Sequence, residues 1–177
     1  MLDLHVLVSP STPKDWVQHC LTSIEAARQQ CFYRVDIHVC EAVLGHIGQA
    51  RAAAYAKGAQ PYVTFVDDDD WLLHKGLALL RSSLLQKPEA VFGRENTFHA
   101  GKIRFNDTRH HLAVYSRDVL IDHSKWKAFG DLAQMNALSG RGVDVLEPGY
   151  VRRAYYRADR YANRAIEEFR AATKTGN

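Results

Sequence analysis

The first 90 residues alternate between apolar strands and amphipathic helices, and no other feature constrains the fold as strongly. This alternation predicts strands over 4–8, 35–40 and 62–66 and helices over 13–29, 47–57 and 73–84. Strands that alternate with helices form a parallel sheet with right-handed crossover connections. Ligands of such sheets bind beside the carboxyl ends of the strands, so the loops that follow these three strands are expected to line one crevice.

The second half of the chain predicts a smaller and more mixed arrangement. Its pattern favours a hairpin around Ala100-Gly101, a strand over 112–116, a helix over 129–139, extended segments over 143–146 and 150–155, and a last helix over 158–172. A length of 177 residues predicts one domain.

Charge is distributed unevenly between the two halves. The formal net charge is +3, but residues 1–93 carry 8 Lys and Arg against 10 Asp and Glu, whereas residues 94–177 carry 15 against 10. A basic half either keeps the protein in solution or faces a phosphate-bearing partner.

Cysteine usage and hydropathy indicate the compartment. The chain has three cysteines and no C-x-x-C pair, which argues against a disulfide framework and against a structural zinc site. No apolar run approaches the roughly 20 residues that span a bilayer, and the first residues lack a basic leader. We therefore expect a cytoplasmic protein with no membrane span.

Four consecutive aspartates, Asp67 to Asp70, directly follow the apolar strand 62–66. Adjacent carboxylates repel one another and lower stability unless something neutralises them. A solvated acidic turn is the simplest interpretation, but the position after a buried strand favours a divalent cation. Mg²⁺ or Mn²⁺ takes one or two protein carboxylates and completes its coordination with phosphate oxygens and water.

Three motifs occur in a fixed order around this run. They are Val8-Ser9-Pro10-Ser11-Thr12, Gly48-Gln49-Ala50-Arg51, and Tyr62-Val63-Thr64-Phe65-Val66 with the aspartates after it. The set resembles family 2 glycosyltransferases with the GT-A fold, whose Asp-x-Asp motif matches Asp67 and Asp69. The resemblance implies an α/β, Rossmann-like, mostly parallel sheet flanked by helices. Residues 1–93 would form the nucleotide-sugar-binding half, and 94–177 a small mixed acceptor-side half.

The resemblance also implies a reaction and the residues for it. The reaction is metal-dependent transfer of a sugar from a nucleotide-sugar donor, with a UDP-sugar favoured, to an acceptor hydroxyl. Mn²⁺ or Mg²⁺ is expected on Asp67, Asp69 and Asp159, the last of which replaces a His of the family. Donor contacts are expected from Pro10, Ser11, Glu41, Arg51, Asp67, Asp68 and Arg157. Glu41 lies in Cys40-Glu41-Ala42-Val43, where the family usually reads Asp-Asp-Gly-Ser.

An inverting transferase needs a carboxylate that accepts the proton of the acceptor hydroxyl. By resemblance this base is Asp131, in a segment where Gly130 replaces the family's usual Glu. Asp131 is also consistent with an ordinary N-cap of the helix over 129–139. Asp118 and Asp122 are weaker candidates for the base.

Two histidine patterns carry less weight. The segment His46-Ile47-Gly48-Gln49 resembles a nucleotidylyl-transfer signature but lacks its second His. His110 and His111 are neighbours, and neighbouring side chains of a strand point to opposite faces, so they are poor joint ligands. A position of one of them at the acceptor cleft stays open, but we favour surface histidines.

Two alternative functions stay open at this stage. One is a metal-dependent nucleotidyltransferase, and the other is a degenerate module that only binds a nucleotide-sugar. The acceptor stays open among a glycan, a protein, a lipid-linked sugar and a modified nucleic acid, and the oligomeric state is open as well.

Overall fold

The computed structural model describes residues 1–43, 45–99, 101–106, 111–126 and 130–153. Its first half contains β1 (Leu2–Val8), α1 (Lys14–Gln29), β2 (Val35–Glu41), α2 (Ile47–Tyr55), β3 (Tyr62–Asp67), β4 (Trp71–Leu72), a 3₁₀ turn (Ala78–Leu80) and α3 (Arg81–Leu84). Its second half contains β5 (Ala90–His99), β6 (Lys102–Asn106), β7 (Ala113–Ser116), 3₁₀ turns at Arg117–Val119 and His123–Lys125, α4 (Gly130–Ala137) and β8 (Gly142–Arg153).

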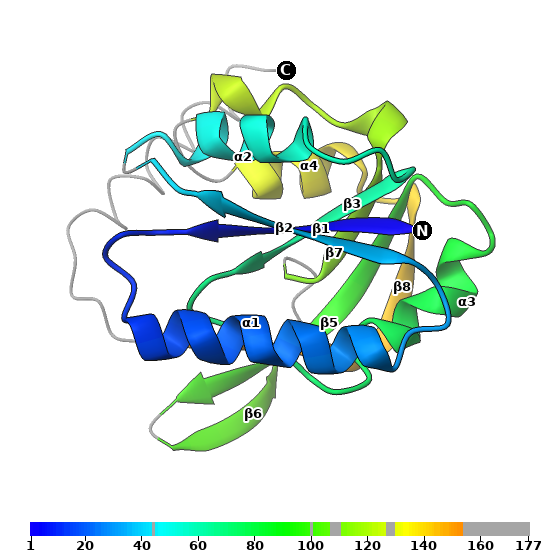
Figure 1. Cartoon of the computed structure of the whole chain (residues 1–177). Coiled ribbons are helices and arrows are strands. Elements are labelled where there is room, and N and C mark those ends of the chain that lie inside the picture. Colours follow the sequence, from blue (N-terminus) through cyan, green and yellow to red (C-terminus); the bar gives the residue numbers. More distant parts are fainter. Residues whose placement is uncertain (44, 100, 107–110, 127–129, 154–177) are drawn as a thin grey trace.

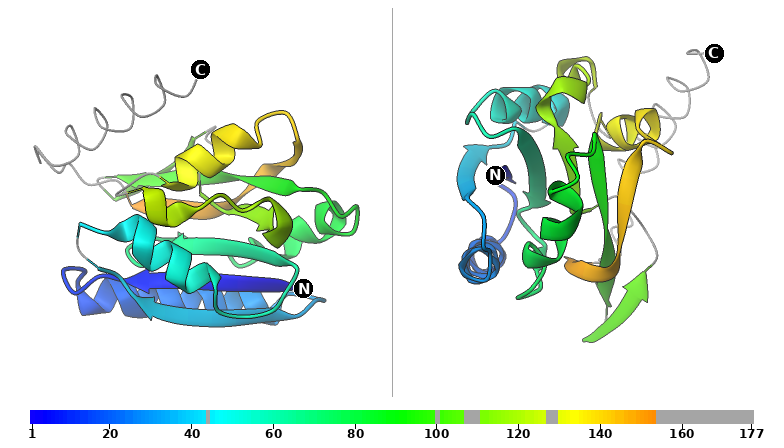
Figure 2. Two further views of the ribbon diagram at one scale, coloured as in Figure 1. Left: turned by 90° about the horizontal axis from the view of Figure 1, so that it is seen from above. Right: turned by 90° about the vertical axis from the view of Figure 1, so that its right-hand side faces the viewer.

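These strands form one eight-stranded sheet with helices on both faces. The strand order is β2-β1-β3-β7-β5-β8-β4, and β6 pairs with β5 outside this path. Figure 1 shows α1 on one face of the sheet and α2 with α4 on the other, and Figure 2 shows the same layers from above and from the side. None of the helices among the described residues is both long and apolar enough to cross a bilayer.

The first three strands form the parallel part of the sheet, as the alternation predicts. β1 pairs in parallel with both β2 and β3. Its last residues, Leu7 and Val8, lie opposite Asp67 of β3 and Glu41 of β2 respectively. The carboxyl ends of the three strands therefore meet at one edge, as expected.

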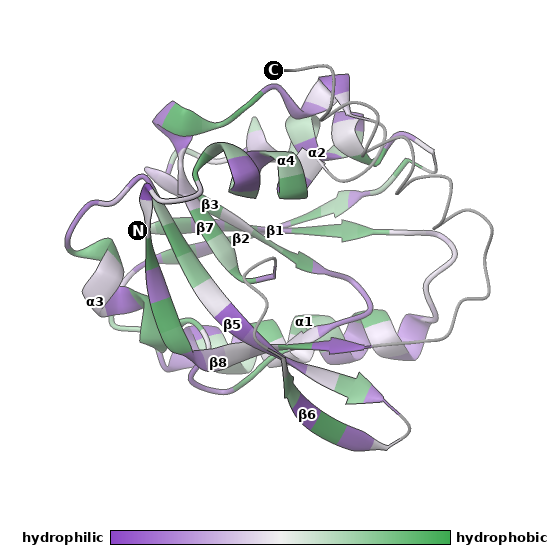
Figure 3. Ribbon diagram, turned by 180° about the vertical axis from the view of Figure 1, so that it is seen from behind, coloured by the Kyte–Doolittle hydropathy of each residue, from purple (hydrophilic) through white to green (hydrophobic). Residues whose placement is uncertain are grey.

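Side chains alternate between the two faces of these strands and build two cores. Leu2, Leu4 and Val6 of β1 pack in the core beneath α1. Val63 and Phe65 of β3 pack in the core on the opposite face, together with residues of α2 and the end of α4. Figure 3 shows the resulting apolar colouring along β1 and β3 and the mixed colouring of α1. Both faces of the central strands are therefore buried.

The other half of the sheet is mixed, and it is larger than the sequence predicts. β7 runs antiparallel to β3 and to β5, and β4 runs antiparallel to β8. The β5–β6 hairpin is antiparallel, and β5 pairs in parallel with β8. A mostly parallel sheet is therefore confirmed only for β2-β1-β3. Residues 143–146 and 150–153 of the predicted extended segments belong to one strand, β8, and residues 154–155 lie outside the described residues.

The helix predicted over 73–84 is wrong in its first half. Trp71 and Leu72, just before the predicted helix, pair with β8, and the Leu73 amide donates to the Gly149 carbonyl at 3.0 Å, so helical turns begin only at Ala78. The leucines nevertheless serve as core residues: Leu77, Leu80 and Leu84 are buried. The hairpin and the helix at 129–139 are confirmed as β5–β6 and α4. The helix predicted over 158–172 lies outside the described residues.

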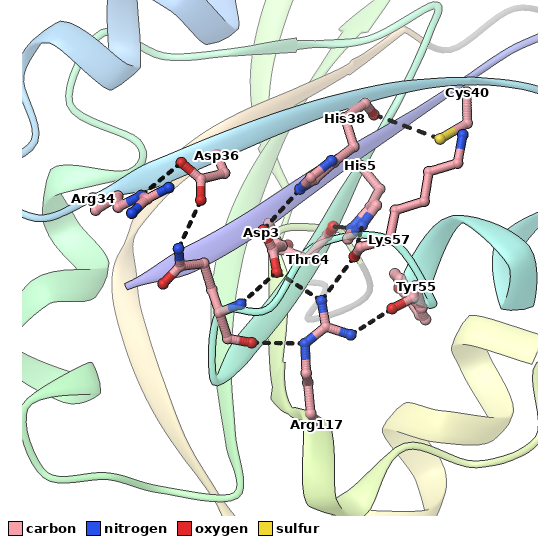
Figure 4. Close-up of polar contacts among 11 residues, drawn as sticks. Asp3, His5, Arg34, Asp36, His38, Cys40, Tyr55, Lys57, Thr64 and Arg117 are labelled. Atoms are coloured by element: carbon pink, nitrogen blue, oxygen red, sulfur yellow. Dashed lines mark hydrogen bonds and ion pairs between the residues drawn. The ribbon is translucent and has the colours of Figure 1, made fainter.

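A buried carboxylate fixes the end of the sheet opposite the strand carboxyl ends. Asp3 is fully buried and accepts hydrogen bonds from His38 Nε2 at 2.7 Å, the Gln60 amide at 2.8 Å and Arg117 Nη2 at 2.6 Å. Figure 4 shows His38 of β2 and Arg117 of the turn after β7 converging on Asp3, and Gln60, the third donor, belongs to the loop before β3. Burial alone would raise the pKa of Asp3, but these hydrogen bonds outweigh it and lower the pKa. The network therefore joins both halves of the chain.

Gly58 provides a test of how firmly Asp3 is held. Its φ is +82°, and a Cβ there would lie 2.4 Å from the Asp3 carboxylate. Gly58→Ala should therefore lower the free energy of unfolding by more than the roughly 1–2 kcal/mol of a left-handed L residue. The matched control is Gly140→Ala, because Gly140 has φ +83° with nothing within 4 Å. Urea unfolding of both variants measures the difference. Equal losses would mean that Asp3 moves freely and is not a fixed point.

Candidate functional site

The loops after β1, β2 and β3 bring several predicted donor contacts to one edge of the sheet. Pro10 and Ser11 follow β1, Glu41 ends β2, and all three are exposed. Ser11 Oγ lies 2.8 Å from Ser9 Oγ. A ligand could therefore reach these loops from solvent. The aspartate turn after β3 lies at the same edge of the sheet.

Partners from the loop after β1 and from β8 hold the aspartate turn. The Ser9 amide donates to Asp68 Oδ2 at 2.7 Å. Asp70 accepts from Tyr150 Oη at 2.8 Å and from the Arg153 amide at 2.5 Å. Asp68 and Asp70 are buried, so a solvated acidic turn does not describe this segment.

His111 is the functional residue that the sequence interpretation missed. It is 5% exposed, so the expectation of a surface histidine is wrong for His111; His110 lies outside the described residues. Its Nε2 lies 3.5 Å from Asp67 Oδ2, its Nδ1 hydrogen-bonds Glu95, and its ring stacks on Tyr150 with centroids 5.0 Å apart. The antiparallel course of β7 explains this placement. The register Thr64↔Val114 extends to bring His111 beside Asp67.

The charges and hydrogen bonds of this turn shift the pKa values of His111 and Asp70. Burial opposes protonation of His111, but hydrogen bonds to Asp67 and Glu95 outweigh it and raise the pKa of His111 to about 10. Burial, together with the charges of Asp67 and Asp69, raises the pKa of Asp70 to about 8. Both groups therefore hold protons at neutral pH that a cation would have to displace.

Three side chains could hold such a cation. Ligand atoms of Asp67, Asp70 and His111 all lie within 4.8 Å of one another. Two carboxylates suit Mg²⁺ and Mn²⁺, and an imidazole beside them favours Mn²⁺ over Mg²⁺ because nitrogen ligands suit transition metals. Asp69, a predicted ligand, is half-buried in the same turn but is not a member of this group. Asp159, the other predicted ligand, lies outside the described residues.

Arg51 contacts the aspartate turn at Asp67 and packs on Phe65. Its guanidinium is buried, lies 3.7 Å from the centroid of the Phe65 ring, and places Nη2 3.5 Å from Asp67 Oδ1. Burial lowers the pKa of Arg51, but the negative charges of Asp131 and Asp67 outweigh it and raise that pKa. Arg51, predicted as a donor contact, therefore lies directly behind the candidate metal group.

The predicted base, Asp131, lies near this arginine. It is the second residue of α4, is 8% exposed and interacts electrostatically with Arg51 and His123. The other candidates for the base, Asp118 and Asp122, are exposed.

Basic residues at the end of β8 complete the site. The Arg153 guanidinium lies 4.4 Å from the centroid of the Trp16 ring and 5.1 Å from that of Trp71, close to the amide that holds Asp70. Arg152 lies 3.4 Å from Glu95. Arg157, predicted as a donor contact, lies outside the described residues.

Comparison with known proteins identifies a fold relationship. No protein-family model and no curated protein sequence matches the chain. The structure is similar to S. aureus TarS, with a TM-score of 0.65 and 14% identity over 86% of this chain and 36% of that one. It is also similar to TarS 1–349 in complex with UDP-GlcNAc, with a TM-score of 0.63 and 14% identity over 87% of this chain and 58% of that one. The chain thus spans 36% of the longer TarS structure.

A third similar structure matches this chain over nearly the full length of both proteins. The complex of Rv0371C with manganese from Mycobacterium tuberculosis has a TM-score of 0.53 and 15% identity, over 94% of this chain and 97% of that one. At such identities the comparisons establish the fold alone: an α/β fold with a curled mixed sheet, similar to glycosyltransferase structures.

A pair of substitutions separates the ligand set of the structure, which includes Asp70, from the set predicted from sequence, which includes Asp69. Asp70→Asn should weaken Mn²⁺ binding far more than Asp69→Asn, because only Asp70 joins the three-residue group. Residues that only hydrogen-bond a metal ligand contribute about 10–100-fold to metal affinity. Loss of a ligand itself should therefore weaken Mn²⁺ binding by at least that factor. Titration of the protein with Mn²⁺ measures both variants. A larger loss for Asp69→Asn would restore the assignment made from sequence.

The pKa of Asp70 gives a second measurement on the same variant. Folded Asp70 keeps its proton up to a pH of about 8, whereas in the unfolded chain it loses the proton near pH ~4. Stability of the metal-free protein therefore falls as pH rises between these values, because the folded state binds more protons. Asp70→Asn should flatten this dependence in unfolding experiments with EDTA. An unchanged slope would contradict the raised pKa.

Proposed function

We propose that this chain is a metal-dependent glycosyltransferase domain that transfers a sugar from a nucleotide-sugar to an acceptor hydroxyl. One observation carries the proposal: Asp67, Asp70 and His111 converge at the carboxyl edge of the parallel strands. Ligands of open α/β sheets bind at this edge. The fold similarity to TarS in complexes with UDP and UDP-GlcNAc supports a nucleotide-sugar as the donor.

The donor would lie along the loops after β1 and β2. Pro10 and Ser11 are exposed there, and Glu41 could accept a hydrogen bond from the imino group of a uracil base. Asp68 orders the first of these loops through the Ser9 amide. A UDP-sugar therefore remains the favoured donor.

The diphosphate of the donor would bind beside the candidate metal group. Asp67, Asp70 and His111 would hold Mn²⁺ or Mg²⁺, and Asp69 remains a further proposed ligand. A bound divalent cation neutralises the charge that develops on a leaving nucleoside diphosphate. Burial raises the pKa of Asp67, but the hydrogen bond with His111 and the charge of Arg51 outweigh it and lower that pKa, which keeps Asp67 ionised.

Asp131 is the proposed general base of an inverting transfer. It would accept the proton of the acceptor hydroxyl as that oxygen attacks the anomeric carbon. Its proximity to Arg51 supports a second possible role, in which Asp131 is the counter-charge of a buried guanidinium. The two roles make different predictions.

A nucleotidyltransferase is the second candidate, supported by the fold similarity to the nucleotidyltransferase-like bifunctional IspDF from Campylobacter jejuni. A glycosyltransferase releases a nucleoside diphosphate from a nucleotide-sugar, whereas a nucleotidyltransferase releases pyrophosphate from a nucleoside triphosphate. A binding module releases neither.

Product analysis tests the proposed function. The protein with Mn²⁺ and UDP-GlcNAc or another UDP-sugar should release UDP, by slow hydrolysis without acceptor or by transfer with one, and EDTA should stop the release. Asp70→Asn is the matched inactive variant. Pyrophosphate release from a nucleoside triphosphate would establish the second candidate instead.

Asp131→Asn separates the two roles of Asp131. As a base, Asp131 is worth about 10²–10⁴-fold in rate, so transfer should fall by that factor while nucleotide affinity stays unchanged. As a counter-charge, its loss should lower the free energy of unfolding, by less than the roughly 3–5 kcal/mol of an uncompensated buried charge, because Asp67 still pairs with Arg51. Asp118→Asn is the control, and a larger loss of rate there would move the base to Asp118.

A further inference from the structure

Glu95 is a buried carboxylate behind the candidate metal group. It lies on β5 and is 1% exposed. Its carboxylate hydrogen-bonds His111 Nδ1, and Arg152 Nε lies 3.4 Å from its other oxygen. Neither the Asp-x-Asp resemblance nor the apolar pattern of the sequence identifies this residue.

A local irregularity of the sheet lies beside Glu95. The register between β5 and β8 shifts between Phe92 and Arg94 and again between Arg94 and Glu95. The extra residues lie on β8, where Pro148 and Tyr150 face the consecutive residues Arg94 and Glu95. Bulges of this kind re-aim side chains beside functional sites. This irregularity places Tyr150 opposite Glu95, and the Tyr150 ring stacks on His111.

Two contacts then fix the orientation of the imidazole. Glu95 engages Nδ1 at one edge of the ring, and the Tyr150 ring stacks on its face at an interplanar angle of 22°. The remaining nitrogen, Nε2, is directed at Asp67. An imidazole that donates from one nitrogen presents the other as a metal ligand, and the partner of the first nitrogen sets its orientation.

We propose that Glu95 is a positioning residue, which holds His111 by Nδ1 so that Nε2 is directed to a divalent cation on Asp67 and Asp70. The inference rests on the proposed metal-dependent function and adds a carboxylate–histidine pair to it. Asp67, Asp70 and His111 contact the cation, and Glu95 acts through His111 alone. Arg152 keeps the buried Glu95 paired with a positive charge, which reduces the free-energy penalty of its burial.

A second carboxylate–histidine pair offers a matched comparison. Asp3 hydrogen-bonds His38 at 2.7 Å, is fully buried and belongs to no three-ligand group among the described residues. Removing its charge should affect stability only. Asp3→Asn therefore reports what the loss of a buried carboxylate beside a histidine does away from the metal group.

A double-mutant cycle tests the inference. Mn²⁺ affinity is measured by titration for the wild type, Glu95→Ala, His111→Ala and the double variant. Glu95→Ala should weaken Mn²⁺ binding about 10–100-fold. If Glu95 acts through His111, the double variant should bind no more weakly than His111→Ala. Full additivity of the two losses would overturn the inference.

Two further measurements distinguish positioning from a general structural effect. Glu95→Gln can still accept a hydrogen bond from Nδ1 and should recover part of the affinity lost in Glu95→Ala. With Co²⁺ as the probe, the visible absorption of the wild type should report nitrogen ligation, which Glu95→Ala should weaken and Asp3→Asn should preserve. Unchanged affinity and spectrum in a folded Glu95→Ala would overturn the inference while leaving the metal site intact. Failure of the wild type to bind either ion would overturn the proposed function and, with it, this inference.

Discussion

Mutual repulsion of the carboxylates in the turn Asp67–Asp70 is the constraint on which the rest of the structure depends. Two unit charges 4 Å apart repel by about 4 kcal/mol at an effective dielectric constant of 20, which exceeds the net worth of a typical hydrogen bond, about 1 kcal/mol. Contacts with the rest of the protein and the retained proton of Asp70 together offset this repulsion. The loop after β1 holds Asp68, β8 holds Asp70, and α2 with His111 holds Asp67. The turn thus joins the parallel half of the sheet to its mixed half.

The sequence predicted those parts of the fold that depend on local patterns. Strand–helix alternation correctly predicted β1, α1, β2, α2 and β3, because each element has its own apolar period and boundary residues. The shared edge of their carboxyl ends follows from parallel pairing. The leucines from 77 to 84 were correctly placed in the core, but the helix over 73–84 was not, since pairing with β8 draws residues 71–72 into the sheet. Such pairing joins residues about 80 positions apart, as in Trp71↔Val151, and no local pattern encodes it.

Pairing between distant residues also explains why the sequence interpretation missed His111 and Glu95. The sequence identified Asp67, which directly follows a recognisable strand. It did not identify His111 or Glu95, because an antiparallel strand begins at the edge where parallel strands end. β7 enters the sheet in this direction, so the residue before its start, not after its end, lies beside Asp67. Only the order of the strands determines this. The one sequence signal available was a histidine directly before the apolar strand predicted over 112–116.

The uneven distribution of charge also has an internal explanation. Residues 1–93 are acidic and residues 94–177 basic, which by itself suggests either solubility or a phosphate-bearing partner. The structure pairs the two halves instead. Arg117 binds Asp3 at 2.6 Å, Arg141 binds Glu89, and His111 lies beside Asp67. In each pair the acid comes from the first half and the base from the second. One arginine of the basic surplus, Arg117, therefore offsets a carboxylate that the first half buries, Asp3, whereas the Arg141–Glu89 pair is exposed. At Asp67 and Asp70 the proposed divalent cation would take the place of the protons that His111 and Asp70 hold at neutral pH.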